Sequence, residues 1–143
     1  MSYQHIVIAV DLNGENQSIL EKGAVLANAY NAKLSLIHVD IHHAPYYSAL
    51  GLQTNHYSGE MPAEVQIKKQ LADLALCSSY PIPDVIVVSG ELLPELKREI
   101  HERGIDLLIF GHHHDVWSNI FSTTRKAINN LDVDILVIPL QSE

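Results

Sequence analysis

The segment with the greatest potential for chemistry in this chain is Gly111-His112-His113-His114. It comes directly after a mostly apolar run, residues 105–110. A strand that ends in glycine and leads into a helix is a common phosphate site, because the backbone amides at the helix start face the ligand. Adjacent imidazoles, by contrast, are typical ligands of transition metals. The segment therefore admits three interpretations: a working nucleotide site, a metal site, or a nucleotide site filled by side chains.

The metal hypothesis rests on those consecutive histidines. Neighbouring side chains diverge from the backbone, so at most two of them can point into one site without help. A third ligand would have to come from another part of the fold, from His38, His42 or Asp11. The chain has no pair of cysteines and no His-Glu-x2-His motif, the patterns that mark dedicated zinc sites. We therefore expect no resident metal and no cofactor.

Ser118, His114 and Asp115 supply the residue types of a catalytic triad within one short segment. A hydrolase also needs an oriented base and oxyanion donors, which the sequence does not reveal. Ser118 also fits the role of a helix N-cap, where its hydroxyl accepts a hydrogen bond from a backbone amide of the first turn. We favour the cap. The sequence then holds no complete catalytic constellation, and we expect no enzyme activity.

Short apolar runs alternate along the chain with helical periodicity. Apolar residues spaced three and four apart predict helices, one closed by Asn31 and another ending near Gly104. Residues 40–61 interrupt the pattern, as a lid, a binding loop or a disordered segment would. Strands that alternate with helices pair in parallel, so we expect one doubly wound α/β sheet with helices on both faces. The predicted strands are residues 6–10, 34–39, 85–88, 106–110 and 135–138.

Length, charge and cysteine content narrow the class of protein. A chain of 143 residues fits one domain, 1–143. A net charge of −8 argues against nucleic acid and anionic membranes as partners, because both require a basic face. The single cysteine, Cys77, follows an apolar helical run and is expected in the core or at its boundary. One cysteine, no signal peptide and no apolar run of about 20 residues together predict a cytoplasmic location.

The predicted topology places a crevice at one edge of the sheet. In open parallel sheets, ligands bind beyond the carboxyl ends of the strands, where the strand order reverses. If the first and fourth strands flank that point, Asp11 and Gly111 lie on opposite sides of the crevice. Val39 ends the second strand and would lie close by. The fold thus predicts a pocket with walls that can be named.

Separate segments of the chain resemble one known family. They are residues 5–11 (HIVIAVD), 31–40 (NAKLSLIHVD), 106–113 (DLLIFGHH) and 133–140 (VDILVIPL). In this order they look like the universal stress protein family, in particular its bacterial A-type branch. The resemblance covers essentially the whole chain apart from residues 40–61. It implies one universal stress protein domain, of the adenine nucleotide alpha hydrolase-like fold, with a five-stranded parallel sheet in the order 3-2-1-4-5.

The resemblance also bears on nucleotide binding. Members that bind nucleotides carry Gly-x2-Gly-x9-Gly-Ser/Thr, whose small residues let backbone amides approach the phosphates. Here Gly111 keeps the first glycine and His114 replaces the second. Thr124 stands at the third glycine and Arg125 at the hydroxyl position. The A-type branch is associated with absent ATP binding. We therefore expect no tight ATP binding, and a vestigial crevice formed by Asp11, Val39, Gly111 and Arg125.

The function that this resemblance implies is a stress response carried out through protein contacts. We expect a non-catalytic, homodimeric regulatory or protective factor whose protein partners the sequence does not identify. The last strand, residues 134–140, would lie at the edge of the sheet, and an uncovered edge strand pairs readily with another chain. Pairing about a two-fold axis would give the homodimer. The alternative is an adenine-nucleotide-binding switch or weak ATPase that uses the Asp11 and Gly111 crevice.

Overall fold

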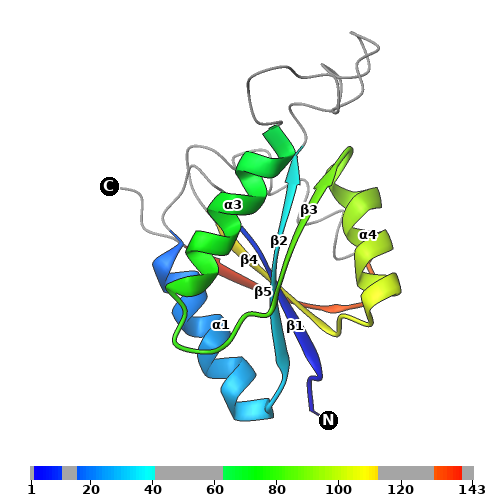
Figure 1. The fold of residues 1–143 in the computed structure, drawn as a ribbon. Helices are drawn as coiled ribbons and strands as arrows, with labels where there is room; N and C mark the ends of the chain where they lie inside the picture. The colour runs from blue at the N-terminus through cyan, green and yellow to red at the C-terminus, as the bar shows by residue number, and fades with distance from the viewer. Residues whose placement is uncertain (1, 11–15, 41–62, 113–130, 140–143) are drawn as a thin grey trace, which may run out of the picture.

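The computed structural model describes residues 2–10, 16–40, 63–112 and 131–139. All five predicted strands appear, with bounds close to those expected from the sequence. A helix lies between β1 and β2, between β2 and β3, and between β3 and β4 (Figure 1). The described elements are β1 (His5–Ala9), α1 (Gln17–Tyr30), β2 (Lys33–Asp40), α3 (Ala63–Leu76), β3 (Asp84–Ser89), α4 (Leu92–Arg103), β4 (Leu107–His112) and β5 (Asp134–Pro139).

The strands form one sheet in the order β3-β2-β1-β4-β5. Every neighbouring pair is parallel; in the centre, Ile8 of β1 lies opposite Leu36 of β2 and Ile109 of β4. Helices α1 and α3 cover one face of the sheet, and α4 lies on the other (Figure 1). The predicted doubly wound α/β fold and its strand order are therefore confirmed.

Two apolar clusters hold the layers together, one on each face of the sheet. Alternate residues of β1 enter alternate clusters: Ile6 and Ile8 pack towards α1 and α3, whereas Val7 and Ala9 pack towards α4. A central strand that is covered on both faces has to be apolar along most of its length. This requirement explains why β1 lacks the polar alternation of a half-exposed strand.

The helix ends follow local backbone chemistry. Asn31 takes the left-handed conformation, with φ of 53°, and its amide bonds back to the carbonyls of Ala27 and Asn28. Gly104 does the same after α4, with φ of 64°. Within α1, Gly23 faces the side chain of Ile8, which would collide with any added Cβ. The helix therefore lies close against the sheet because this position has no side chain.

The prediction that Cys77 lies in the core or at its boundary is wrong, because the thiol is exposed. The helix that leads to it packs Ile67 and Leu71 into the core but ends at Leu76. The amide of Cys77 then bonds to the carbonyl of Leu74 over 3.0 Å, closing a turn that leaves the helix. Periodicity alone cannot place a residue beyond the point where the helix stops.

In the described part of the chain, no helix is long and apolar enough to cross a membrane.

Candidate functional site

The carboxyl ends of β1 and β4 meet at the middle of the sheet. Ala9 lies opposite Phe110, so the residues that leave the two strands emerge side by side. From β1 the chain passes outward through β2 to β3, and it returns to the other side of β1 with β4 and β5. The strand order therefore reverses between β1 and β4, the location where open α/β sheets bind ligands.

Two residues of the predicted crevice, Val39 and Gly111, are described at this edge. Val39 near the end of β2 is half-buried and packs against the cluster on the α4 face. Gly111 in β4 is also partly buried and lies opposite Ile138 of β5. These two predicted crevice residues thus lie at the same edge, on strands separated by β1.

Several predicted site residues lie outside the described part of the chain. They are Asp11 and Arg125 of the predicted crevice, His113 and His114 of the histidine segment, His42, Asp115, Ser118 and Thr124. The backbone of His112 belongs to β4, but its side chain is not described. Within residues 2–10, 16–40, 63–112 and 131–139, no three His, Cys, Asp or Glu side chains are grouped to hold a metal ion. The expectation that the chain holds no resident metal therefore stays a prediction.

His38 has a specific structural role at this edge. Its Nδ1 lies 3.0 Å from the carbonyl oxygen of Val10, the residue that follows β1. A carbonyl oxygen only accepts hydrogen bonds, so Nδ1 carries the proton and donates it. The other nitrogen, Nε2, is then the acceptor in the neutral ring. The amide of Val10 also donates to the carbonyl of Ile37 over 2.9 Å. Two contacts from β2 therefore fix the backbone just before Asp11.

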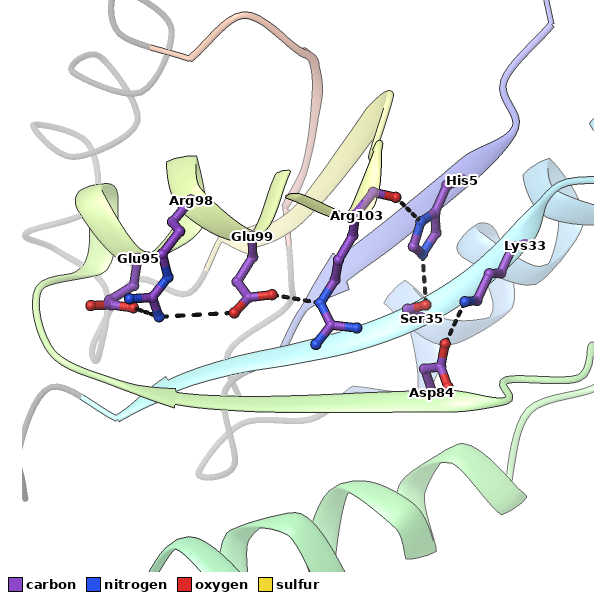
Figure 2. A network of polar contacts seen from close by, with 8 residues as sticks. All are labelled: His5, Lys33, Ser35, Asp84, Glu95, Arg98, Glu99 and Arg103. Atoms are coloured by element: carbon purple, nitrogen blue, oxygen red, sulfur yellow. Dashed lines mark hydrogen bonds and ion pairs between the residues drawn. The ribbon is translucent and has the colours of Figure 1, made fainter. Parts of the chain in front are cut away.

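The opposite edge of the sheet, where the strands begin, holds a polar network (Figure 2). His5 opens β1, and its Nε2 lies 2.8 Å from Oγ of Ser35 in β2. Its Nδ1 lies 3.2 Å from the carbonyl oxygen of Arg103, the last residue of α4. Because that carbonyl must accept, Nδ1 carries the proton, and Ser35 donates its hydroxyl proton to Nε2.

A serine that donates to a histidine is the arrangement of an activated nucleophile. Ser35, however, is fully buried and His5 is only 7% exposed. A substrate cannot reach this hydroxyl without opening the sheet. The pair therefore joins β1 to β2 and α4, and it does not form a catalytic dyad in this fold.

Burial also determines the charge state of His5. It lowers the pKa of the imidazole below its usual 6.5, and the nearby Lys33 ammonium lowers it further. The hydrogen bond to Arg103 and the carboxylates of Asp106 and Asp84 oppose this effect without reversing it. The neutral ring is accordingly the form that the folded state favours.

Carboxylates complete the network at this edge. Asp106 accepts hydrogen bonds from the backbone amides of Gln4 over 2.8 Å and His5 over 3.0 Å. Its own amide donates to the carbonyl of His5 over 3.0 Å, so β1 and the start of β4 are joined twice. Lys33 pairs with Asp84 across β2 and β3, and this contact lowers the pKa of the Asp84 carboxyl (Figure 2).

The sequence contained a signal for this network that motif analysis missed. Ser35 lies between Leu34 and Leu36 inside one strand, and His5 opens another. A polar residue inside a strand that is buried on both faces must find a hydrogen-bond partner. Which partner it finds depends on the register of β1 and β2, in which Val7 lies opposite Ser35 and places His5 diagonally beside it.

The model of the universal stress protein family matches residues 2–139. This chain belongs to the universal stress protein family. It is 41% identical to the Universal stress protein A homolog of Pasteurella multocida over 141 residues, covering 99% of both chains. It is 38% identical to Universal stress protein A of Escherichia coli K12, covering 100% of this chain and 99% of the relative.

Solved structures of the family share the fold. A universal stress protein from Archaeoglobus fulgidus in complex with dAMP superposes with a TM-score of 0.64 at 16% identity, covering 96% of this chain and 99% of that one. One from Arabidopsis thaliana with AMP bound gives a TM-score of 0.59 at 10% identity, covering 97% of this chain and 93% of that one. At such low identity the likeness establishes the α/β architecture, in line with the sheet described above.

Proposed function

We propose that this universal stress protein is a non-catalytic regulatory or protective factor in the stress response, active as a homodimer. The observation that carries the proposal is the identity of 38–41% to proteins named Universal stress protein A over nearly the whole chain. The chemistry of the described residues supports it, because the Ser35–His5 pair is closed to substrates. A net charge of −8 argues against nucleic acid and anionic membranes as partners. A cytoplasmic location remains a prediction of the sequence.

The proposal includes the absence of tight ATP binding. Its support is the replacement of two glycines by His114 and Thr124 and of the hydroxyl residue by Arg125. A histidine at a position of close approach crowds a triphosphate, and its ring cannot replace a backbone amide. The competing proposal is an adenine-nucleotide switch or weak ATPase. It draws on the switch point between β1 and β4 and on the solved relatives in complex with dAMP and with AMP bound.

Calorimetry with ATP and Mg²⁺ separates the two proposals. We expect the wild-type chain to bind ATP more weakly than about 1 mM, which corresponds to about 4 kcal/mol of binding free energy. The matched gain-of-function variant is His114→Gly/Thr124→Gly/Arg125→Ser, which restores the family pattern and should bind ATP more tightly than the wild type. Micromolar binding by the wild type, lost in Asp11→Ala, would establish the nucleotide switch and reject the present proposal.

The proposed dimer forms through β5, which lies at one edge of the sheet. Leu136 and Val137 of this strand are 37% and 40% exposed, although both are large and apolar. The only charged residue of β5, Asp134, already accepts a hydrogen bond from the hydroxyl of Tyr3 over 2.8 Å. A strand edge with exposed apolar residues and no lysine is favourable for pairing with a second copy.

A charge in the middle of β5 tests this interface. We expect Val137→Asp to sediment as a monomer where the wild type sediments as a dimer. Val25→Asp is the matched control, because Val25 is 68% exposed on α1 and lies outside the proposed interface. A dimer that survives Val137→Asp unchanged, or a wild type that is monomeric, would remove β5 as the interface.

A further inference from the structure

His5 lies where three elements join at the amino-terminal edge of the sheet. It is the first residue of β1, and its ring bonds to Ser35 of β2 and to the last residue of α4, Arg103 (Figure 2). Its backbone is bonded to Asp106, which leads into β4. One titratable side chain therefore links β1, β2 and α4.

The neutral ring satisfies both of its partners. Nδ1–H donates to the Arg103 carbonyl, and Nε2 accepts from the Ser35 hydroxyl. A second proton on Nε2 would face the Ser35 hydroxyl with a donor. That hydroxyl is fully buried, so reversing its hydrogen bond would leave its own proton in need of another acceptor.

The charged groups around the ring do not provide a site for an imidazolium. On β2 and β3, Lys33 repels a positive charge, and Asp84 is already paired with that ammonium. The Asp106 carboxylate is engaged by two backbone amides. On α4, the Arg103 guanidinium is positive and bonds to Glu99 over 2.5 Å. Protonation of His5 would therefore bury a cation without a dedicated counter-ion.

We propose that protonation of His5 in acid weakens the attachment of the α4 carboxyl end to β1 and β2. The opening would expose Ile100 and Ile105, which are buried at this junction. An acidified cell would then present an apolar surface that is hidden at neutral pH. This inference concerns the amino-terminal edge and is independent of the proposed dimer through β5 and of nucleotide binding.

The direction of the pH effect follows from linkage. The pKa of His5 is lower in the folded state than its usual 6.5. Below about pH 6.5 the unfolded chain binds this proton first, so His5 stabilises the fold at neutral pH and loses that contribution as the pH falls towards the folded-state pKa. One proton changes the unfolding equilibrium constant by at most tenfold per pH unit, which sets the size of the expected effect.

The test compares wild type with His5→Gln in urea unfolding at pH 7.5, 6.5 and 5.5, at one protein concentration. We expect the stability advantage of the wild type to shrink below pH 6.5, by up to tenfold in equilibrium constant per pH unit. His101→Gln is the matched control, because His101 lies exposed on α4 and its loss should leave the pH profile unchanged. Identical pH profiles for wild type and His5→Gln would overturn the proposal.

A measurement on the wild type keeps the proposal testable if His5→Gln does not fold. NMR should show the His5 ring titrating below its usual pKa of 6.5. Over the same range, exchange of the Ile105 amide, bonded to the Ile100 carbonyl over 3.1 Å, should rise beyond its intrinsic pH dependence. Titration of His5 at or above pH 6.5, or protection of the Ile105 amide that is independent of His5 ionisation, would reject the proposed acid-sensitive attachment of α4.

Discussion

The two edges of this parallel sheet carry different chemistry. At the amino-terminal edge, described side chains such as His5, Ser35 and Asp106 bond to one another and to backbone groups. At the carboxyl-terminal edge, Val39 and Gly111 offer little side-chain chemistry, and the crevice predicted there is defined by where the strands end. Among the described residues, His5, Ser35 and Asp106 thus form their bonds away from the edge where parallel sheets bind ligands.

The largest loss of stability is expected when Asp106, at the amino-terminal edge, loses its carboxylate. Asp106→Ala removes the acceptor for two backbone amides, of Gln4 and His5. Hydrogen bonds to a charged acceptor contribute about 1.5–3 kcal/mol each, so we expect the free energy of unfolding to fall by about 3 kcal/mol. Urea unfolding at neutral pH measures this change.

Asp132→Ala is the control for that measurement, because Asp132 is an exposed aspartate near β5 and should contribute less than about 0.5 kcal/mol. Asp106→Asn keeps one acceptor oxygen and should lie between wild type and alanine. If Asp106→Ala and Asp132→Ala lowered stability equally, the amino-terminal edge would not be the stabilising one.

Two glycines allow the edges to be compared at the level of the backbone. Gly90 follows β3 at the carboxyl-terminal edge, with φ of 141°, and an added Cβ would lie 2.9 Å from a Glu95 oxygen. Gly104 follows α4 at the other edge, with φ of 64° and nothing within 4 Å of an added Cβ. We expect Gly90→Ala to lower stability by about 2 kcal/mol and Gly104→Ala by about 1 kcal/mol.

Asparagine distinguishes the two positions, because it tolerates the left-handed conformation of Gly104 but not the backbone of Gly90. Gly104→Asn should be nearly as stable as the wild type in thermal unfolding, as Asn31 already shows for the end of α1. Gly90→Asn should be as destabilised as Gly90→Ala. Equal effects of asparagine at the two positions would mean that conformation is not what selects glycine there.

How far the sequence predicts these edges depends on the range of the interactions involved. The five strands follow from apolar runs, and Gly104 follows from local backbone chemistry, so both are predictable within a few residues of chain. The bond between His5 and Ser35 joins residues 30 positions apart and needs the strand register as well as the fold. The predicted burial of Cys77 is wrong for a local reason, because the helix ends at the residue before it. The roles of Asp11 and Arg125 in the crevice stay predictions.

A smaller effect is expected from His38, which holds the end of β1 at the carboxyl-terminal edge. His38→Leu removes the donor to the Val10 carbonyl and should lower stability by about 1 kcal/mol. NMR of the wild type should show the proton on Nδ1 of His38. His101→Leu, on the exposed face of α4, should be nearly neutral. A neutral His38 ring protonated on Nε2 would contradict the hydrogen bond on which this prediction rests.

The smallest effect belongs to the ion pair of Lys33 and Asp84, although it lies at the stabilising edge. Their side chains are 45% and 42% exposed, and exposed pairs contribute about 0.2–1 kcal/mol. Lys33→Gln should lower stability by about 0.5 kcal/mol or less at low salt, and less at high salt.

Because Lys33 lowers the pKa of Asp84 in the folded state, this contribution is present above the unfolded pKa of 3.8 and is lost as the pH falls through the folded pKa. An NMR titration in which Lys33→Gln leaves the Asp84 pKa unchanged would show that the pair is not formed in solution. A large loss of stability in the same variant would instead mean that Lys33 acts through the His5 network, whose buried hydrogen bonds, unlike this pair, are shielded from water.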